Sequence, residues 1–207
     1  MKFWLYDILA CPIDKHYPLK LYIFSYENSP DEFNLYIDIF KQRDISKITQ
    51  ENVIRIEKKE HDTLIKDDVI IEANKIENYL RLILKSIDEF DYIYDRSSNE
   101  LSKDCMTMIQ NEIKKAIQNF LNNLNPVQIS EIIPELFFLN KIKVNIEIES
   151  GVLFCPKCKR WFPIIETIPQ MLPDEFRKEE EELKFLKTIR NLLDEEFFKQ
   201  DLKPYNL

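Results

Sequence analysis

The chain of 207 residues contains a single glycine, Gly151. Glycine-rich loops let the backbone of Rossmann and P-loop proteins approach phosphate groups closely, so these nucleotide-binding folds need several glycines at fixed spacing. Because this sequence has nowhere to place them, we expect neither class. The chain also has only two histidines and no Gly-x-Ser-x-Gly motif, which gives little support to the common hydrolase arrangements.

The composition is that of a folded, acidic protein. Hydrophobic residues make up 44% of the chain, enough for a packed core. The formal net charge of −8 repels nucleic-acid phosphates, so we expect no strong direct binding to nucleic acid. No uncharged stretch approaches the roughly 18 residues that a membrane span needs, and four cysteines are sparse for a secreted disulfide scaffold. The sequence therefore predicts a cytoplasmic protein with no membrane partner.

Three of the cysteines suggest a metal site. Cys155 and Cys158 form a Cys-x-x-Cys pair, which supplies half of a tetrahedral zinc site, and Cys11 opens a similar Cys-Pro segment near the other end of the chain. For the fourth ligand, His16 is favoured by chemistry because imidazole suits zinc better than carboxylate, and Asp14 is favoured by its spacing. We predict zinc held by the three cysteines and His16, with Asp14 as the alternative. A metal-free pair of redox-active or buried thiols is the competing interpretation.

Short stretches near both ends of the chain resemble β-strands. Alternation of apolar and polar residues, or short apolar runs bounded by turn residues, mark four of them: 19–24, 142–149, 152–154 and 161–165. Gly151 is expected to turn the chain between two of these strands, and Pro163 favours an edge position or a bulge. The Cys-x-x-Cys pair would then lie at the turn of a hairpin, as in a zinc knuckle.

The rest of the chain has the periodicity of helices. Between about residues 28 and 140, apolar residues recur at spacings of three and four, and a further acidic helix is expected from Asp174 toward Phe198. The sequence thus predicts an α+β protein with a small zinc-ribbon-like antiparallel β domain built from both chain ends. Its parts are residues 1–27 with 141–173 (the ribbon), 28–140 (a large α-helical insertion) and 174–207 (a C-terminal helical extension).

The segment after the cysteine pair is rich in apolar residues. A small ribbon cannot bury all of them by itself, so we expect some to contact a partner protein. An exposed apolar edge strand can extend the sheet of such a partner. Packing against the C-terminal helix of the same chain is the competing interpretation. The residues expected at the partner surface are Trp161, Phe162, Pro163, Ile164, Ile165, Ile168, Met171 and Leu172.

The two ends of the chain together resemble a known family. The segment from Met1 to Pro12, followed by Pro18-Leu19, and the segment from Gly151 through Cys-Pro-Lys-Cys to Leu172 are similar to the tRNA methyltransferase activator family, the small zinc-ribbon-like subunits of the Trm one-twelve type. The resemblance covers roughly the first 24 residues and residues 141–173. Its specific part is the combination of the two segments in this order around a helical insertion, since Cys-x-x-Cys alone is weak.

The resemblance implies a non-catalytic function. Members of that family bind, activate and stabilise S-adenosylmethionine-dependent methyltransferases that act on tRNA, rRNA or a translation release factor. It implies a heterodimer with such an enzyme, zinc in the metal-binding members and no other cofactor. It does not name the methyltransferase.

Two other classes of function are weaker. A zinc-ribbon module of the ribosome or transcription machinery would need a basic face, for which the chain offers Lys157, Lys159 and Arg160. A zinc enzyme would need an open coordination position beside a general base such as Asp14 or Glu166, and nothing in the sequence places either.

Overall fold

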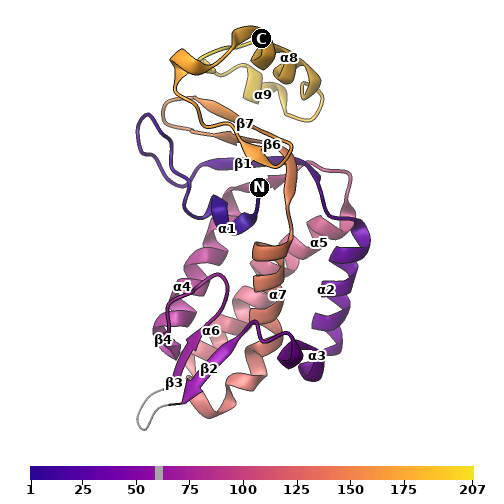
Figure 1. Ribbon diagram of the computed structural model, residues 1–207, viewed down its shortest axis with the longest axis vertical. Helices are drawn as coiled ribbons and strands as arrows, with labels where there is room; N and C mark the ends of the chain where they lie inside the picture. Colours follow the sequence, from indigo (N-terminus) through magenta and orange to yellow (C-terminus); the bar gives the residue numbers. More distant parts are fainter. Residues whose placement is uncertain (59–62) are drawn as a thin grey trace.

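The computed structural model describes residues 1–58 and 63–207, so His61 lies outside the described residues. Three layers follow one another along its longest axis (Figure 1): a C-terminal segment, a sheet made from both ends of the chain, and a group of helices. The α+β class predicted from the sequence is confirmed. In the part of the chain that the structure describes, no helix is both long enough and apolar enough to cross a membrane.

The main sheet joins segments that are far apart in the sequence. Its strands are β1 (Lys20–Tyr26), β5 (Ile93–Asp95), β6 (Ile148–Phe154), β7 (Trp161–Ile165) and β8 (Ile168–Pro169). Their order is β5-β1-β6-β7-β8, with β1 parallel to β5 and the other neighbours antiparallel. Strands are therefore present near both chain ends as expected, although residues 148–154 form one strand where two were expected, and β5 adds one that comes from within the helical insertion.

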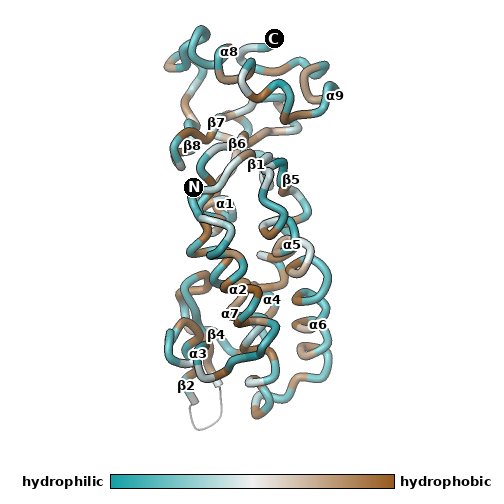
Figure 2. Tube along the Cα trace, turned by 90° about the vertical axis from the view of Figure 1, so that its right-hand side faces the viewer, coloured by the Kyte–Doolittle hydropathy of each residue, from teal (hydrophilic) through white to brown (hydrophobic). Residues whose placement is uncertain are grey.

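Helices fill most of the remaining length. They are α1 (Phe3–Tyr6), α2 (Pro30–Gln42), α3 (Ile45–Gln50), α4 (Ile76–Asp88), α5 (Glu100–Met108), α6 (Lys114–Asn122) and α7 (Ile133–Asn145), with the 3-10 helices η1 (Glu89–Tyr92) and η3 (Pro126–Ile132) and the π-helical turn η2 (Ile109–Ile113). Along them, hydrophobic residues recur between hydrophilic ones, as a helix with one buried stripe requires (Figure 2). A second small antiparallel sheet lies at the far end of the helices, formed by β2 (Arg55–Lys58), β3 (Thr63–Lys66) and β4 (Asn74–Lys75).

Local sequence signals explain where several helices begin. The Ser29 N–H donates to Glu32 Oε2 at 3.1 Å in a capping box, and Pro30 takes the first turn of α2, where its missing N–H costs nothing. Asn99 caps α5 by accepting from the Ser102 N–H at 3.3 Å. These are the Asn, Ser and Pro residues that punctuate the helical pattern in the sequence.

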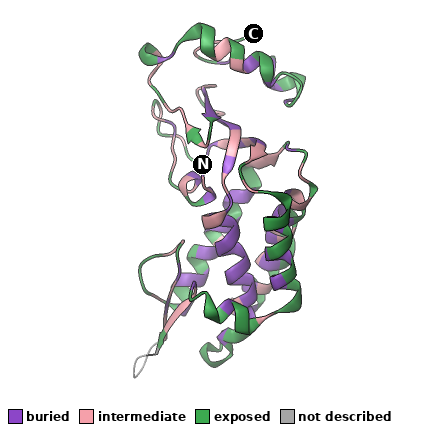
Figure 3. Cartoon of the chain, turned by 45° about the vertical axis from the view of Figure 1, so that its right-hand side comes forward, coloured by how far each residue is buried: buried purple, intermediate pink, exposed green. Residues whose placement is uncertain are grey.

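Helix α7 corrects one predicted strand. It passes through the middle of the other helices and is buried along most of its length (Figure 3). It continues to Asn145, so the strand expected over 142–149 is wrong in its first half, and β6 begins only at Ile148. In its last turns the buried Lys141 and Lys143, which pair with Glu51 and Asp7, alternate with the apolar Ile142 and Val144, so this end of the helix imitates the alternation of a half-buried strand.

Gly151 and Pro163 also differ from expectation. Gly151 does not turn the chain but lies inside β6, paired with Ile23 on one side and Ile164 on the other. Pro163 lies one strand in from the edge, because the two-residue strand β8 follows β7 in the sheet. The Pro163 carbonyl accepts from the Gln170 N–H at 2.8 Å, a bond on that side that needs no proline N–H.

The C-terminal extension forms three short pieces in place of one helix: η4 (Asp174–Phe176), α8 (Glu179–Thr188) and α9 (Glu195–Phe198). A continuous helix from Asp174 to Phe198 would be about 37 Å long, whereas the seven-residue strands beneath span about 23 Å. By folding back, the extension places its apolar residues on the sheet. It lies on the side of the sheet opposite the helices (Figure 1).

The sheet thus has two buried faces. Alternate residues of β6 and β7 point to opposite sides: Leu153 and Phe162 join the main core with the helices, while Val152, Phe154 and Trp161 join a second cluster with the C-terminal extension. We call this second side the covered face; it is formed by Phe24, Val152, Phe154 and Trp161. Residues on it are buried as completely as residues of the main core.

Candidate metal centre and partner surface

The Cys-x-x-Cys pair lies in a tight turn between β6 and β7, as predicted. The Cys155 N–H donates to the Arg160 carbonyl at 2.8 Å, and the Lys159 N–H donates back to the Cys155 carbonyl at 2.9 Å. Lys159 adopts the left-handed conformation with a φ of 61°. The turn is thereby closed at both ends, which directs Cys155 and Cys158 to the same side.

The loop before β1 repeats this turn. The Cys11 N–H donates to the His16 carbonyl at 3.0 Å, and the Lys15 N–H donates to the Cys11 carbonyl at 2.9 Å. Lys15 has a φ of 60°, matching its counterpart in the other turn. Asp14 therefore occupies, three residues after its cysteine, the position that Cys158 occupies in the other turn.

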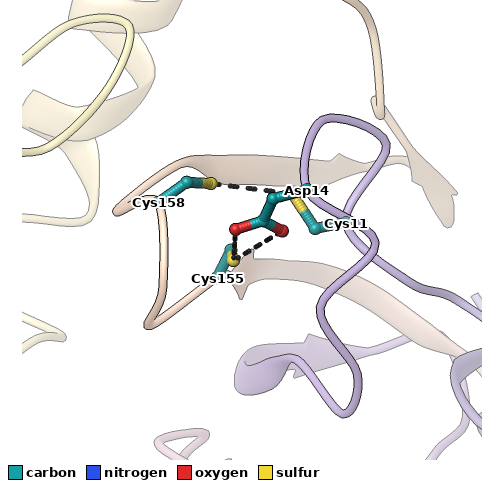
Figure 4. Close-up of side chains that lie close together, drawn as sticks. All are labelled: Cys11, Asp14, Cys155 and Cys158. Carbon is teal, nitrogen blue, oxygen red and sulfur yellow. Dashed lines mark hydrogen bonds between the residues drawn. The ribbon is translucent and has the colours of Figure 1, made fainter.

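The two turns bring four ligand atoms together (Figure 4). One atom from each of Cys11, Asp14, Cys155 and Cys158 lies within 4.8 Å of all the others. The Sγ atoms of Cys11 and Cys158 are 3.6 Å apart, and Cys155 Sγ is 3.6 Å from Asp14 Oδ1. A tetrahedral zinc ion with bonds of about 2.3 Å to sulfur places its thiolate ligands about 3.8 Å apart. The donor set and its spacing fit a metal ion of this kind.

His16, the ligand that chemistry favoured, is not part of this group. Its backbone N–H donates to Asp14 Oδ1 at 3.0 Å, so the residue orients the carboxylate through its main chain. The repeated turn explains why: two residues after Asp14, the chain has already left the turn. Of the two alternatives for the fourth position, the geometry favours Asp14 in place of His16.

The backbone of the turns also affects the ionisation of the ligands. Burial raises the pKa of Cys11 to about 12 and raises that of Cys155 as well. Burial acts in the same direction on Cys158 and Asp14, but hydrogen bonds outweigh it: the Arg160 N–H and the Cys155 thiol lower the pKa of Cys158, and the backbone N–H after the turn lowers that of Asp14. The matching third positions of the two turns are therefore where the backbone best supports negative charge.

The eight residues expected at a partner surface divide into two groups. Trp161, Phe162, Pro163 and Ile164 are buried within the chain, Met171 is half-buried, and Ile165, Ile168 and Leu172 are exposed. Strand β7 is buried as far as Ile164 because both faces of the sheet are covered. The exposed residues are the last residue of β7 and two residues that follow it at the outer edge of the sheet. We call Ile165, Ile168 and Leu172 the apolar edge.

Trp161 shows how completely the chain covers its own strand. Its Nε1–H donates to the Tyr205 carbonyl at 3.1 Å, and its ring stacks on Phe185 with the planes 8° apart. The guanidinium of Arg177 lies 5.0 Å from the centre of the same ring. For Trp161, the competing interpretation of packing against the C-terminal extension is therefore the one the structure supports.

A groove of about 240 Å³ lies between the apolar edge and α8. Ile165, Leu172, Phe176 and Phe185 supply its apolar walls, and Arg177 lies among them. Phe176 is 67% exposed, more than any residue of the apolar edge. Phe176 was not expected at this surface because it follows the boundary predicted at residue 173, although an aromatic residue between charged ones was a visible signal.

A second polar cluster, not expected from the sequence, lies where α1, α4 and α7 meet. The buried Lys143 Nζ donates to Asp7 at 2.5 and 2.7 Å and lies 3.9 Å from Glu89 Oε2. Burial, with Asp7 nearby, raises the pKa of Glu89 to about 7. The cluster borders a cavity of about 750 Å³ whose other walls include Trp4 and Leu82. Its ion pairs join the end of α1 to α7.

Comparison with known proteins agrees with this architecture. The model of one family, described as Trm112p-like protein, matches residues 2–166. No curated protein and no solved structure matches the chain. The matched stretch contains both cysteine turns, the helical insertion and the strands through β7, and it ends before β8 and the C-terminal extension. Family members are generally non-catalytic activators associated with methyltransferases. The match spans well over half of the sequence, and the chain belongs to the Trm112p-like family.

Proposed function

We propose that this chain is a non-catalytic activating and stabilising subunit of S-adenosylmethionine-dependent methyltransferases that modify tRNA, rRNA or a translation release factor. It would act in the cytoplasm as one half of a heterodimer, and its free thiols suit a reducing compartment. Family membership supports the general role. The observation that carries the proposal is the apolar edge: Ile165, Ile168 and Leu172 are 42, 58 and 43% exposed at one end of the main sheet.

The apolar edge has the chemistry of a docking strand. Strand β8 has only two residues and is the last strand in the sheet, so the partner's sheet can continue from it through backbone hydrogen bonds. The exposed isoleucines then supply apolar contact. An interface of about 800 Å² per partner, largely apolar at about 25 cal/mol per Å², exceeds the cost of association and allows a stable heterodimer.

Zinc would have a structural role in this proposal. Cys11, Asp14, Cys155 and Cys158 would hold the ion, and together they would fill its four positions with no place left for a substrate. The bound ion would join the first strand segment to the β6–β7 hairpin, which are about 140 residues apart in the chain. The ribbon that carries the apolar edge would thereby keep its shape.

Activation would follow from linkage. If the subunit binds only the folded, cofactor-competent form of the methyltransferase, it raises the population of that form without taking part in methyl transfer. The same argument explains stabilisation, because an apolar patch on the enzyme becomes covered on binding.

The alternative of a ribosomal or transcription zinc ribbon has less support. Of the three basic residues it requires, Arg160 pairs with Asp174 at 2.7 Å and Lys159 bonds Gln200 Oε1 at 3.4 Å. Both partners belong to the C-terminal extension. Only Lys157 is left free of such contacts with the extension, and one lysine makes a poor nucleic-acid surface.

A pair of matched substitutions tests the proposal. Ile168→Asp places a charge in the apolar edge, and Val127→Asp places one at an exposed apolar residue of η3, far along the chain. Tagged full-length protein with either change is purified from the native source, and co-purifying methyltransferases are identified and quantified. We expect Ile168→Asp to reduce recovery at least tenfold and Val127→Asp to leave it unchanged, since a buried charge at an interface is strongly unfavourable.

The free energy of unfolding of both variants should lie within about 0.5 kcal/mol of that of the unchanged protein, because both side chains are exposed. Phe162→Asp, in contrast, would destabilise the free chain, because Phe162 is fully buried in the main core. Failure to recover any methyltransferase with the unchanged protein would reject the proposed function. Equal recovery with Ile168→Asp would reject the apolar edge as the docking site.

A further inference from the structure

The covered face and its cover differ in their relation to the family. Phe24, Val152, Phe154 and Trp161 all lie within residues 2–166, the stretch that matches the family model. The residues that cover them, among them Leu186 and Phe197, lie outside it. The apolar face thus lies within the stretch that matches the family, and its cover follows that stretch.

The cover is a separate unit of packing. Its apolar residues form a cluster with the covered face alone and do not enter the main core. They are Leu186, Ile189, Leu193, Phe197, Phe198 and Leu202. Because the two clusters are separate, the cover can leave the sheet while the main core stays intact.

The cover also contains a buried hydrogen-bond donor without a partner among the described residues. The Arg177 side chain is fully buried; its Nε donates to Glu182 Oε1 at 2.6 Å, but its Nη1 has no hydrogen-bond partner among the described residues. A buried donor left unpaired lowers the stability of the cover. The groove beside Phe176 lies at the seam between the cover and the apolar edge, where a bound partner would already be in contact.

The charges indicate what fits the face. Arg160 on the sheet pairs with Asp174 of the cover at 2.7 Å, and Arg96 pairs with Asp194 at 2.6 Å. The rim of the covered face is therefore basic, and its present occupant meets it with carboxylates. A replacement would need an apolar stripe to contact the face and acidic residues at its margins.

We propose that the covered face is a second docking surface, which the chain occupies with its own residues 174–207 until the partner methyltransferase replaces them with an amphipathic helix that has acidic margins. The inference rests on the proposed function. Binding would begin at the apolar edge and extend to the covered face as α8 and α9 leave it. The extension thereby weakens the affinity of any partner that lacks such a helix.

Hydrogen exchange of the full-length protein tests this, alone and in complex with the methyltransferase recovered by co-purification. We expect amides of residues 180–198 to exchange at least tenfold faster in the complex, while those of residues 161–172 exchange more slowly. A complex in which residues 180–198 keep or gain protection overturns the inference and leaves the proposed function standing. Absence of any methyltransferase overturns both.

A pair of matched substitutions gives a second readout. Leu186→Ala removes a buried side chain from the cover, and Leu80→Ala removes one of the same size from α4 in the main core. If the cover competes with the partner, Leu186→Ala tightens binding of the methyltransferase about tenfold or more, whereas Leu80→Ala does not. Unchanged or weaker binding by Leu186→Ala contradicts the inference.

Discussion

Replacement of Gly151 by alanine would place a methyl group where the main sheet has no room for one. Gly151 lies in β6 opposite Ile23, next to a shift in the pairing of β1 with β6. A Cβ added there would lie 2.6 Å from the backbone oxygen of Tyr22 and 3.3 Å from Ile164 Cδ1. The first neighbour is main chain, which cannot rotate away as a side chain can.

We expect Gly151→Ala to lower the free energy of unfolding by about 3 kcal/mol. Overpacking in a close-packed interior costs about 1–3 kcal/mol, and a clash with backbone falls at the upper end. Alanine also restricts the conformations of the unfolded chain, which raises the free energy of unfolding by about 0.4–1 kcal/mol where the folded backbone has room for the methyl group. At Gly151 there is no such room, so this gain does not offset the clash. For a domain of this size, about 3 kcal/mol corresponds to a decrease in Tm of about 6–12 °C.

The assay is thermal and urea unfolding, followed by circular dichroism, of the full-length protein. Ser150→Ala is the matched control, because it changes the neighbouring residue of the same strand, which is half-buried. It should remain within about 0.5 kcal/mol of the unchanged protein. A Gly151→Ala variant as stable as the control would show that β1 and β6 move apart at little cost, and the reasoning about this glycine would be wrong.

Three further substitutions test the polar sites. Asp14→Ala should lower the zinc measured per chain by mass spectrometry, whereas His16→Ala should leave it unchanged; the reverse result would restore His16 as the ligand. Glu89→Gln should become more stable relative to the unchanged protein as pH rises from 5 to 8. A pKa raised from the ordinary 4.5 to about 7 means that the folded state binds the proton more tightly, a stabilisation that is lost over this range. Between pH 5 and 8, the free energy of unfolding of Glu89→Gln, measured in urea, should rise relative to that of the unchanged protein by at most about 3 kcal/mol. If the difference between the two proteins is the same at all pH values, Glu89 does not titrate in this range.

Local patterns predicted the ribbon well. The strand β1, the hairpin of β6 and β7 and its cysteine turn were all marked by short apolar runs and by Cys-Pro, signals that act within a few residues. The long separation between the two halves could be inferred because both halves carry the same kind of turn. The match to the Trm112p-like family covers residues 2–166, the stretch in which these signals occur.

The same local patterns gave wrong predictions for the end of α7 and for Gly151, which are buried among several elements. The end of α7 alternates like a strand because its lysines, Lys141 and Lys143, are buried in ion pairs and so do not mark an exposed polar stripe that would reveal the helical period. Gly151 was expected at a turn because turns are the commonest use of glycine. Its actual role, a close approach of two strands, depends on a partner strand more than 120 residues earlier in the chain.

The apolar run around Trp161 raised a question that composition cannot answer. Excess apolar surface requires a cover, but the free energy of burial is the same whether the cover comes from the same chain or from another. The structure divides the run: Trp161 is enclosed by the extension, while Ile168 remains exposed. Which of these residues are covered depends on how the chain folds back after residue 173. The apolar periodicity there predicted one continuous helix and gave no sign of the break between α8 and α9.

The fourth residue of the cysteine cluster, in contrast, follows from the backbone of the two turns, which the sequence already carries. The segments Cys11–His16 and Cys155–Arg160 share Cys-Pro at their start and lysine at their fifth position, where both turns need a left-handed residue. Two segments that close with the same hydrogen bonds direct the same positions to the same side, here toward the cluster. The third residue after each cysteine, Asp14 or Cys158, lies in the cluster. The residue after the lysine, His16 or Arg160, provides the carbonyl that closes the turn. Imidazole is the better zinc ligand in general, but a ligand must first be brought within reach.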